Sequence, residues 1–285
     1  MSRSTARRVR HAVVAGSWYP GRAKKLAETI DDYLSAVDQA AVEGELIGLI
    51  SPHAGYAYSG QTAAHAYGQL AGRAYDTVVL MGPSHRAWVG NYAASAEMAY
   101  ETPLGQVPLD RDFIEDLAGR VTINPVQDDM EHSLEIQLPF LQRQLGNFGL
   151  VPLMMSADDP AAARRLAGAL AEIIRARETA GQRCLLVASS DLHHIKDYDE
   201  VVRRDRAVVE AVEDYDLERL GEVLMAPGSS VCGRMAILAA LHAARHLGAD
   251  ESRVLHHTNS GDVSGRRVPG QYTVGYMAAA IYRSA

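Results

Sequence analysis

The stretch Leu46-Ile-Gly-Leu-Ile-Ser-Pro-His53 joins a short apolar run to a polar end. The run 46–50 is uninterrupted and of strand length, which is typical of a strand buried on both faces of a sheet. Pro52 ends such a strand, and Gly55 allows the chain to turn directly afterwards. The stretch therefore predicts a buried strand with the His53 imidazole at the rim of the sheet.

Two further apolar runs are followed by polar residues in the same way. Residues 77–81 (Thr-Val-Val-Leu-Met) lead into Gly82-Pro-Ser-His85, and residues 184–188 (Cys-Leu-Leu-Val-Ala) lead into Ser189-Ser-Asp191. The carboxyl ends of parallel strands meet at one edge of a sheet, where α/β proteins bind their ligands. We therefore expect the three polar ends to converge on one spot.

Apolar runs alternate with amphipathic stretches along the whole chain. This alternation predicts the α/β class, with a mainly parallel central sheet flanked by helices. No repeat, low-complexity tract or linker-like change of composition interrupts it, so we expect residues 1–285 to form a single domain. Pro139 should kink or break the helix that contains it. Strands are expected over 46–50, 77–81, 150–154, 184–188, 254–256 and 272–281, and helices over 24–37, 61–70, 112–117, 131–145, 161–175, 198–214, 217–224 and 234–246.

The composition limits the classes of function. Of the 285 residues, 47% are hydrophobic and 22% are charged, and the net charge is −7. This acidic balance argues against a general nucleic-acid binder and against a protein that binds anionic membranes. The apolar runs fall short of the roughly 18 residues that a membrane-spanning helix needs. Two cysteines are too few for a disulfide scaffold. We therefore expect a cytoplasmic protein that binds neither nucleic acid nor membrane.

The beginning of the chain is basic, with arginines at positions 3, 7, 8 and 10 and no acidic residue before Glu28. A targeting peptide and a solvated arm that enters the fold both account for this pattern. The apolar stretch 12–15 is far shorter than the core of a secretory signal. A solvated arm is therefore the favoured interpretation.

Two histidines that follow strand ends with a proline are candidate metal ligands. Neutral imidazole is the commonest protein metal ligand, although a lone histidine is more often structural, and the repeated arrangement of His53 and His85 favours ligation. Cys232, at a predicted loop-to-helix junction, would complete a site similar to those of catalytic zinc. With a carboxylate in its place, the set would be the facial triad of non-haem iron oxygenases. Spacing alone leaves the role of Cys232 open.

Two other motifs carry titratable side chains with more than one interpretation. In Ser189-Ser-Asp-Leu-His-His194, a carboxylate and an imidazole at one strand end suit general acid–base catalysis, but Ser190 or Asp191 could equally cap a helix. In Glu131-His-Ser-Leu-Glu135, the two glutamates share a helix face and favour a solvated acidic helix start when taken alone. The other cysteine, Cys184, opens an apolar run and is expected to be a buried hydrophobic residue.

Taken together and in order, the motifs resemble those of the Memo-like family and its bacterial and archaeal relatives. The resemblance runs from about residue 15 to the last predicted strand. It is carried by Gly16-Ser-Trp-Tyr19, Ser51-Pro-His-Ala-Gly-Tyr56, Gly82-Pro-Ser-His85, Glu131-His-Ser-Leu-Glu135, Ser189-Ser-Asp191, Cys232-Gly-Arg234 and Ser260-Gly-Asp262.

The resemblance implies a fold similar to the class III extradiol dioxygenases, the LigB-like group. It implies metal ligation by His53, His85 and Cys232, and it puts His194 at the position of the dioxygenase acid–base histidine. His132 would lie at the same pocket. The adjacent His193 leaves open which of the two neighbouring rings faces that pocket. Contacts to the substrate are expected from Tyr56, His193 and Glu131.

Function follows less directly from the resemblance, because a fold does not fix an activity. Eukaryotic members are described as signalling adaptors that recognise phosphotyrosine peptides and as redox-linked metal proteins. Prokaryotic members often belong to a three-part system with a radical-SAM protein and an AMMECR-type protein, which are therefore expected partners.

The leading expectation is an Fe(II)-dependent oxidoreductase of extradiol type that acts on a small catechol. In it, His194 would move the phenolic proton, Asp191 would orient His194, and His132 would bind substrate or oxygen. The thiolate makes Zn(II) or copper competing metals. The alternatives are a metal-binding or peptide-binding protein without turnover, and a metal-assisted hydrolase.

Overall fold

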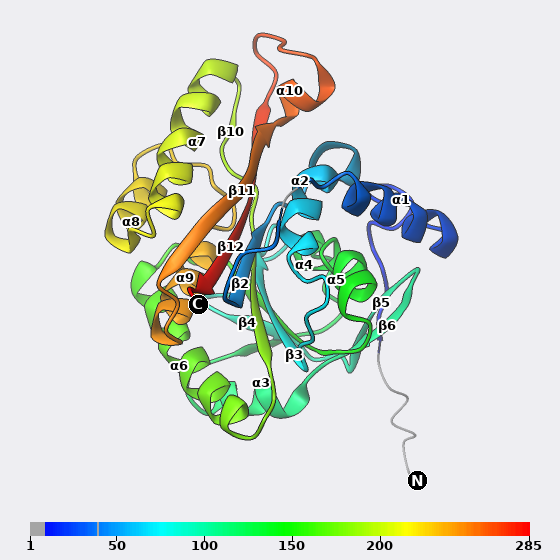
Figure 1. Ribbon diagram of the computed structural model, residues 1–285, viewed down its shortest axis with the longest axis vertical. Helices are drawn as coiled ribbons and strands as arrows, with labels where there is room; N and C mark the ends of the chain where they lie inside the picture. Colours follow the sequence, from blue (N-terminus) through cyan, green and yellow to red (C-terminus); the bar gives the residue numbers. More distant parts are fainter. Residues whose placement is uncertain (1–8, 39) are drawn as a thin grey trace.

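The computed structural model describes residues 9–38 and 40–285, and an open sheet runs through its centre (Figure 1). The strand order is β10-β12-β2-β9-β3-β8-β4-β7, and β11 pairs with β12. A small separate sheet has the order β1-β5-β6. The strands are β1 (Val9–Arg10), β2 (Glu45–Ser51), β3 (Thr77–Pro83), β4 (Ala93–Ser95), β5 (Ala99–Thr102), β6 (Gly105–Pro108), β7 (Asn124–Val126), β8 (Gly149–Met155), β9 (Cys184–Ser189), β10 (His194–Ile195), β11 (Glu251–Asn259) and β12 (Thr273–Arg283).

Helices cover both sides of this sheet, as the alternating sequence pattern predicted. Helix α2 packs on β2 and β12 with α1 and α5 beside it, while α9 packs on β9, β3 and β2 with α6 beside it. The helices are α1 (Ala23–Ser35), α2 (Tyr56–Gly68), α3 (Arg111–Ala118), α4 (His132–Glu135), α5 (Leu138–Leu145), α6 (Pro160–Thr179), α7 (Tyr198–Glu213), α8 (Leu217–Met225), α9 (Arg234–His246) and α10 (Ser260–Ser264).

The middle of the sheet is parallel, and antiparallel pairs occur toward both of its margins. Strands β2, β9, β3 and β8 run parallel in adjacent positions, so that Val79 pairs with Leu186 on one side and Val151 on the other. Strand β12 is antiparallel to β2, β10 and β11, and β4 is antiparallel to β8. The α/β class is confirmed. Parallel pairs occur between the central strands and between β4 and β7, while β12 is antiparallel to its neighbours because it returns from β11 without a long helical crossover.

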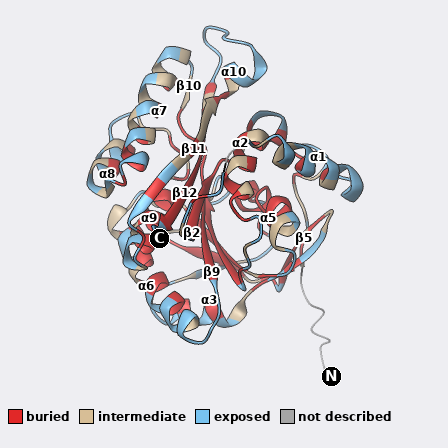
Figure 2. Ribbon diagram, viewed as in Figure 1, coloured by how far each residue is buried: buried red, intermediate tan, exposed pale blue. Residues whose placement is uncertain are grey.

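Apolar residues from both helical layers and the sheet form one continuous buried cluster. Figure 2 shows the central strands coloured as buried. Cys184 belongs to it, as expected of a buried hydrophobic residue. The predicted helix over 131–145 is divided into α4 and α5, with Pro139 in the first turn of α5, where its missing N–H needs no partner. None of the described helices is long and apolar enough to cross a membrane.

Arg10, in the described part of the basic stretch, differs from the solvated arm that the sequence predicts. Residues 3, 7 and 8 lie outside the described residues, but Arg10 is buried, with 2% of its surface exposed. Its guanidinium pairs with Asp129 and Glu135 and donates to the carbonyl of Glu131. A buried arginine of this kind is tolerated because its charge is balanced and its N–H groups are satisfied. The same contacts show that Glu135 and Glu131 are buried rather than a solvated acidic helix start.

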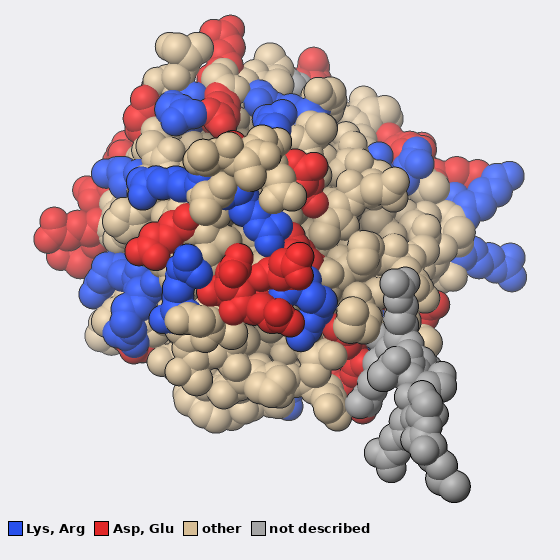
Figure 3. Space-filling view, turned by 90° about the horizontal axis from the view of Figure 1, so that it is seen from below, with Lys and Arg blue, Asp and Glu red and all other residues tan. Residues whose placement is uncertain are grey.

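Acidic and basic side chains are interspersed on the face drawn in Figure 3. In the part of that face that the structure describes, they do not gather into one broad basic patch. The described part of this face therefore offers no electrostatic platform for a polyanion.

Candidate metal centre

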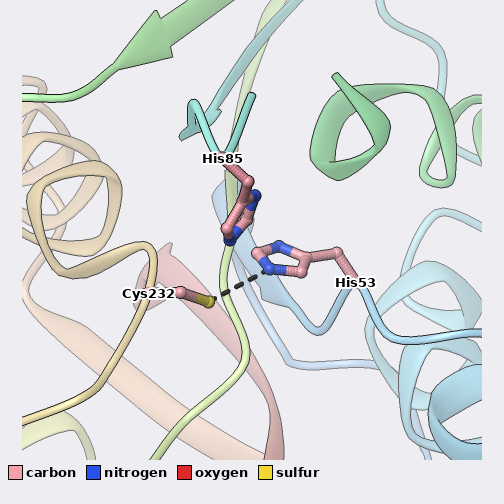
Figure 4. A group of neighbouring side chains, drawn as sticks. All are labelled: His53, His85 and Cys232. Atoms are coloured by element: carbon pink, nitrogen blue, oxygen red, sulfur yellow. Dashed lines mark hydrogen bonds between the residues drawn. The ribbon is translucent and has the colours of Figure 1, made fainter. Parts of the chain in front are cut away.

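Three side chains from separate parts of the chain converge beyond the carboxyl ends of the central strands. His53 follows β2, His85 follows β3, and Cys232 precedes α9. One ring nitrogen of each histidine and the Sγ atom of Cys232 all lie within 4.8 Å of one another. Figure 4 shows the three side chains pointing toward one another, with Sγ of Cys232 3.0 Å from Nε2 of His53. This is the group that the sequence singled out as candidate ligands.

A chain of hydrogen bonds determines which nitrogen of His53 carries the proton. The hydroxyl of Ser189 donates to the carbonyl of Ser133 at 2.6 Å, which uses its one proton. Its oxygen must therefore accept from both Nε2 of Gln137, at 2.8 Å, and Nδ1 of His53, at 3.0 Å. Tyr67 in turn donates to the amide oxygen of Gln137 and fixes its orientation. His53 is thus protonated at Nδ1, and its Nε2 lone pair is free for a metal.

His85 is oriented by a carboxylate in the same manner. Its Nδ1 lies 2.9 Å from Oε1 of Glu131, and its backbone N–H donates to Oε2 of that residue. Burial alone would raise the pKa of Glu131, but hydrogen bonds from His85 and from the backbone of Ser133 lower it to about 2. Glu131 is therefore an ionised acceptor that fixes the orientation of the His85 ring.

The charge states of His53 and Cys232 fit a divalent cation. Burial, with His85 and His132 nearby, holds the pKa of His53 well below its ordinary value, so its imidazole is neutral. Burial and the adjacent Asp191 raise the pKa of the Cys232 thiol, so without a cation its proton is donated to Nε2 of His53. A metal would take the place of that proton. Two imidazoles and one thiolate suit Zn(II), Fe(II) or copper.

A second group of neighbouring donors, formed by His85, Glu131 and His132, is less suited to a metal. The carboxylate oxygens of Glu131 already accept from the backbone N–H groups of His85, His132 and Ser133 and from the His85 ring. Glu131 is thus occupied as a hydrogen-bond acceptor behind the site.

A cavity of about 560 Å³ opens beside the candidate ligands. Its walls are partly aromatic, and Trp18 contacts His132 with ring centroids 4.4 Å apart. The size and the mixture of apolar walls with a few polar groups are typical of pockets for small molecules. Among its lining residues are Trp18, His53, Tyr58, His132, His194 and Tyr276.

A smaller cavity of about 260 Å³ lies on the other side of the group. His85 and Cys232 both line it, together with polar residues that include Ser84, Ser156 and Arg234. The guanidinium of Arg234 is paired with Asp158. The three donors therefore lie between an aromatic cavity and a polar one.

His194 and His193 have different positions, which answers the question that the sequence left open. His194 lines the aromatic cavity, and its buried Nε2 has no hydrogen-bond partner among the described residues. Burial and nearby His85 lower the pKa of His194, so the ring is a neutral proton acceptor. His193 is buried away from the cavity, and its Nδ1 lies 2.8 Å from Oδ1 of Asp205. The structure thus places His193 away from the cavity at which a contact with substrate is expected.

Asp191 lines the aromatic cavity, but it does not orient His194 as expected. Its Oδ1 accepts the backbone N–H of His53 at 2.7 Å and of Ala54 at 3.2 Å. Burial raises the pKa of Asp191 to about 7, although these two hydrogen bonds act in the opposite direction. Asp191 thus holds the loop that presents His53.

The two other residues expected to contact substrate do not line the cavity either. Tyr56 is buried, and its hydroxyl donates to the carbonyl of Ile136 at 3.0 Å. Glu131 is buried behind His85, as described above. His132 does line the cavity, and its Nδ1 lacks a hydrogen-bond partner in the described structure, although it lies 3.2 Å from Oε1 of Glu131.

The interpretation of the sequence missed several residues that support the site. Gln137 and Tyr67 fix the tautomer of His53, yet both lie in stretches that look like ordinary amphipathic helix. Trp18 and Ser189 were present in the quoted motifs without an assigned role. The signal for Trp18 was its place in an aromatic motif before the first predicted strand, over 46–50. Its role in the cavity wall follows only from the fold.

Comparison with known proteins identifies relatives of this chain. Residues 10–280 match the family model described as Memo-like protein. A MEMO1 family protein of Thermotoga neapolitana is 35% identical over 95% of this chain and 99% of its own length. A MEMO1 family protein of Aeropyrum pernix is 36% identical over 96% of this chain and 100% of its own length.

One solved structure, an uncharacterized protein of Escherichia coli K12, is similar to this fold with a TM-score of 0.51. The similarity covers 82% of this chain and 99% of the Escherichia coli chain, at 14% sequence identity. This likeness extends to the fold alone. The match over residues 10–280 and the nearly full-length relatives at more than 30% identity show that the chain belongs to the Memo-like family.

Proposed function

We propose that this protein is a metal-dependent oxidoreductase that acts on a small catechol-like molecule, with Fe(II) held by His53, His85 and Cys232. One observation carries the proposal: the neutral His194, whose buried Nε2 has no hydrogen-bond partner among the described residues, lines an aromatic-walled cavity that His53 and His85 also line. A proton acceptor beside a metal site and an aromatic wall together fit a phenolic substrate.

Bound Fe(II) would supply open coordination positions and redox chemistry. The chain's own residues would bind and orient the ring between Trp18, Tyr58 and Tyr276. His194 would accept a phenolic proton at Nε2 and return it to the product. His132, which lines the same cavity, would hold a polar substrate atom. Ring cleavage of a catechol by one O₂ places both oxygen atoms in the product, so the reaction needs no separate reductant.

Cys232 favours a second candidate function. A thiolate is a softer ligand than the carboxylate of most non-haem iron sites, and it suits Zn(II) or copper. With Zn(II), the same three residues and the same cavity would support activation of water for hydrolysis. Without turnover, the site would be a metal store or a redox sensor.

The decisive experiment is metal analysis of protein purified without oxygen, followed by oxygen-uptake measurements with Fe(II) and a panel of catechols. The proposal expects stoichiometric iron, oxygen uptake matched by a ring-opened product, and loss of uptake in His194→Ala with iron retained. Stoichiometric zinc and hydrolysis of a panel of esters would instead support the second candidate function, a metal-assisted hydrolase. Iron binding without oxygen uptake on any catechol would leave a metal-binding protein without this activity.

A further inference from the structure

Two arginines flank the candidate metal centre, and they differ in how their charge is used. Arg234, on the side of the smaller cavity, is paired with Asp158 through two of its nitrogens. Arg86, in the wall of the aromatic cavity, makes no hydrogen bond or ion pair with any residue that the structure describes. Arg86 therefore brings an uncompensated positive charge to this cavity.

The rest of the cavity wall does not neutralise that charge. Among the described residues that line the cavity, Arg86 is the one arginine or lysine, and Asp191 is the one aspartate or glutamate. Asp191 is 3% exposed, and its Oδ1 is engaged by the N–H groups of His53 and Ala54. An anion entering the cavity would thus find one free guanidinium and aromatic surfaces.

The cavity has room for more than a bare ring. At about 560 Å³ it is within the range of sites that hold small organic molecules. Trp18, Tyr58 and Tyr276 provide apolar surface for a ring, while Arg86 follows His85 directly in the chain and lies in the same wall. A guanidinium forms two parallel hydrogen bonds with a carboxylate, which gives it both charge and directional preference.

Resting on the function proposed above, we infer that the substrate is an aromatic acid, and that Arg86 binds the carboxylate of its side chain while the ring lies in the aromatic cavity. Arg86 is then a specificity-determining residue. A solvated arginine with no such role would give the protein no preference between a charged ligand and a neutral ligand of the same shape.

The test uses two ligands that differ in charge alone, 3,4-dihydroxyphenylacetate and 3,4-dihydroxyphenylacetamide. Calorimetric titrations would be done on Zn(II)-loaded protein, in which binding is measured without oxidation. We expect the unchanged protein to bind the acid about three- to tenfold more tightly than the amide, as a partly exposed ion pair would provide. This preference should shrink with added salt.

Two variants of Arg86 and one control variant test whether Arg86 causes the preference for the acid. Arg86→Met should bind both ligands equally, and Arg86→Glu should prefer the amide. Arg253→Met, which removes an exposed arginine that lines a different cavity, should keep the preference for the acid.

The outcomes separate the two proposals. Equal binding of acid and amide by the unchanged protein, or a preference that survives Arg86→Met, would overturn the inference and leave the proposed function standing. If neither ligand binds while Zn(II) remains bound, the proposed function falls for catechols and the inference falls with it.

Discussion

The Sγ atom of Cys232 lies 3.0 Å from Nε2 of His53, although the two residues are 179 positions apart in the chain. The contact is short because the thiol proton is shared with an imidazole that has its other nitrogen tied to Ser189. Both atoms are metal ligands in their deprotonated forms, so the proton between them marks the position that a cation would occupy. This relationship brings the carboxyl end of β2 together with the start of α9.

Cys232→Ser should remove most of the bound metal. A hydroxyl is a far weaker ligand for Zn(II), Fe(II) or copper than a thiolate, so we expect a loss of at least tenfold in metal affinity. Metal content measured by mass spectrometry on anaerobically purified protein checks this. The matched control is Cys184→Ala, since burial raises the pKa of Cys184 to about 12 and its thiol lies in the core. Equal metal content in Cys232→Ser and unchanged protein would exclude Cys232 as a ligand.

Ser189→Ala should weaken metal binding without touching a ligand. The substitution removes the acceptor that keeps the proton on Nδ1 of His53, and supporting partners of this kind are worth about 10- to 100-fold in metal affinity. Competition with a chromophoric chelator measures the change. Ser252→Ala is the control, because it also deletes a buried hydroxyl that donates to a backbone carbonyl, at the start of β11. A similar change in affinity in both variants would mean a general loss of stability.

Much of this centre follows from the sequence because three apolar runs each end in a reactive side chain. Parallel neighbours in a sheet bring such ends together, so His53, His85 and Asp191 could be placed near one another before the fold was known. Cys232 could not be placed in this way, because it precedes a helix rather than follows a strand. Its assignment depended on the family resemblance.

Other features depend on tertiary contacts that local sequence does not encode. Arg10 stands in a basic stretch, and only the fold shows that Asp129 and Glu135 bury and balance it. His193 and His194 are adjacent and chemically identical, but pairing of β10 with β12 turns one ring toward Asp205 and the other toward the cavity. The antiparallel pairs toward the margins of the sheet were missed because the direction of a strand leaves no mark in its composition.

His194→Ala and His193→Ala should therefore fail in different ways. His194→Ala should keep its metal and its melting temperature but lose turnover by about 10²- to 10⁴-fold, as the loss of a general acid–base does. His193→Ala should lower the melting temperature, because it leaves the Asp205 carboxylate buried with fewer partners. Calorimetry and oxygen uptake on the same two preparations measure both effects. Reversed phenotypes would mean that His193 is the ring that serves the cavity.

Asp205 should make stability depend on pH in the acid range. Burial alone would raise the pKa of Asp205, but its contacts with His193 and His257 lower it below the ordinary 3.8. A lowered folded-state pKa stabilises the fold above about pH 3.8, and this contribution is lost as the pH falls through the folded-state pKa. Asp205→Asn should lower the free energy of unfolding by about 2–4 kcal/mol at pH 7 and by progressively less below pH 4. Urea unfolding of both proteins between pH 3 and pH 7 tests this, and a gap that stays constant over the range would contradict it.

Gly233→Ala should disturb the junction between the metal centre and α9. A Cβ at this position would lie 2.4 Å from the carbonyl oxygen of Ser189 and 2.6 Å from Cβ of Ser190, so the helix start would have to move away from β9. The φ of Gly233 is −96°, so the cause is lack of space rather than an unusual backbone conformation. Because Cys232 precedes this residue, we expect both a loss of about 1–3 kcal/mol in stability and weaker metal binding.

Gly168→Ala provides the comparison for that prediction. Gly168 lies inside α6, and no atom approaches within 4 Å of the position that its Cβ would take. Alanine there should stabilise the protein by about 0.5–1 kcal/mol, since glycine is the poorer helix former, and should leave metal affinity unchanged. Chemical denaturation and chelator competition on both variants would separate the effects. If Gly233→Ala bound metal as tightly as Gly168→Ala, the close packing of α9 against β9 would not be what holds Cys232 in place.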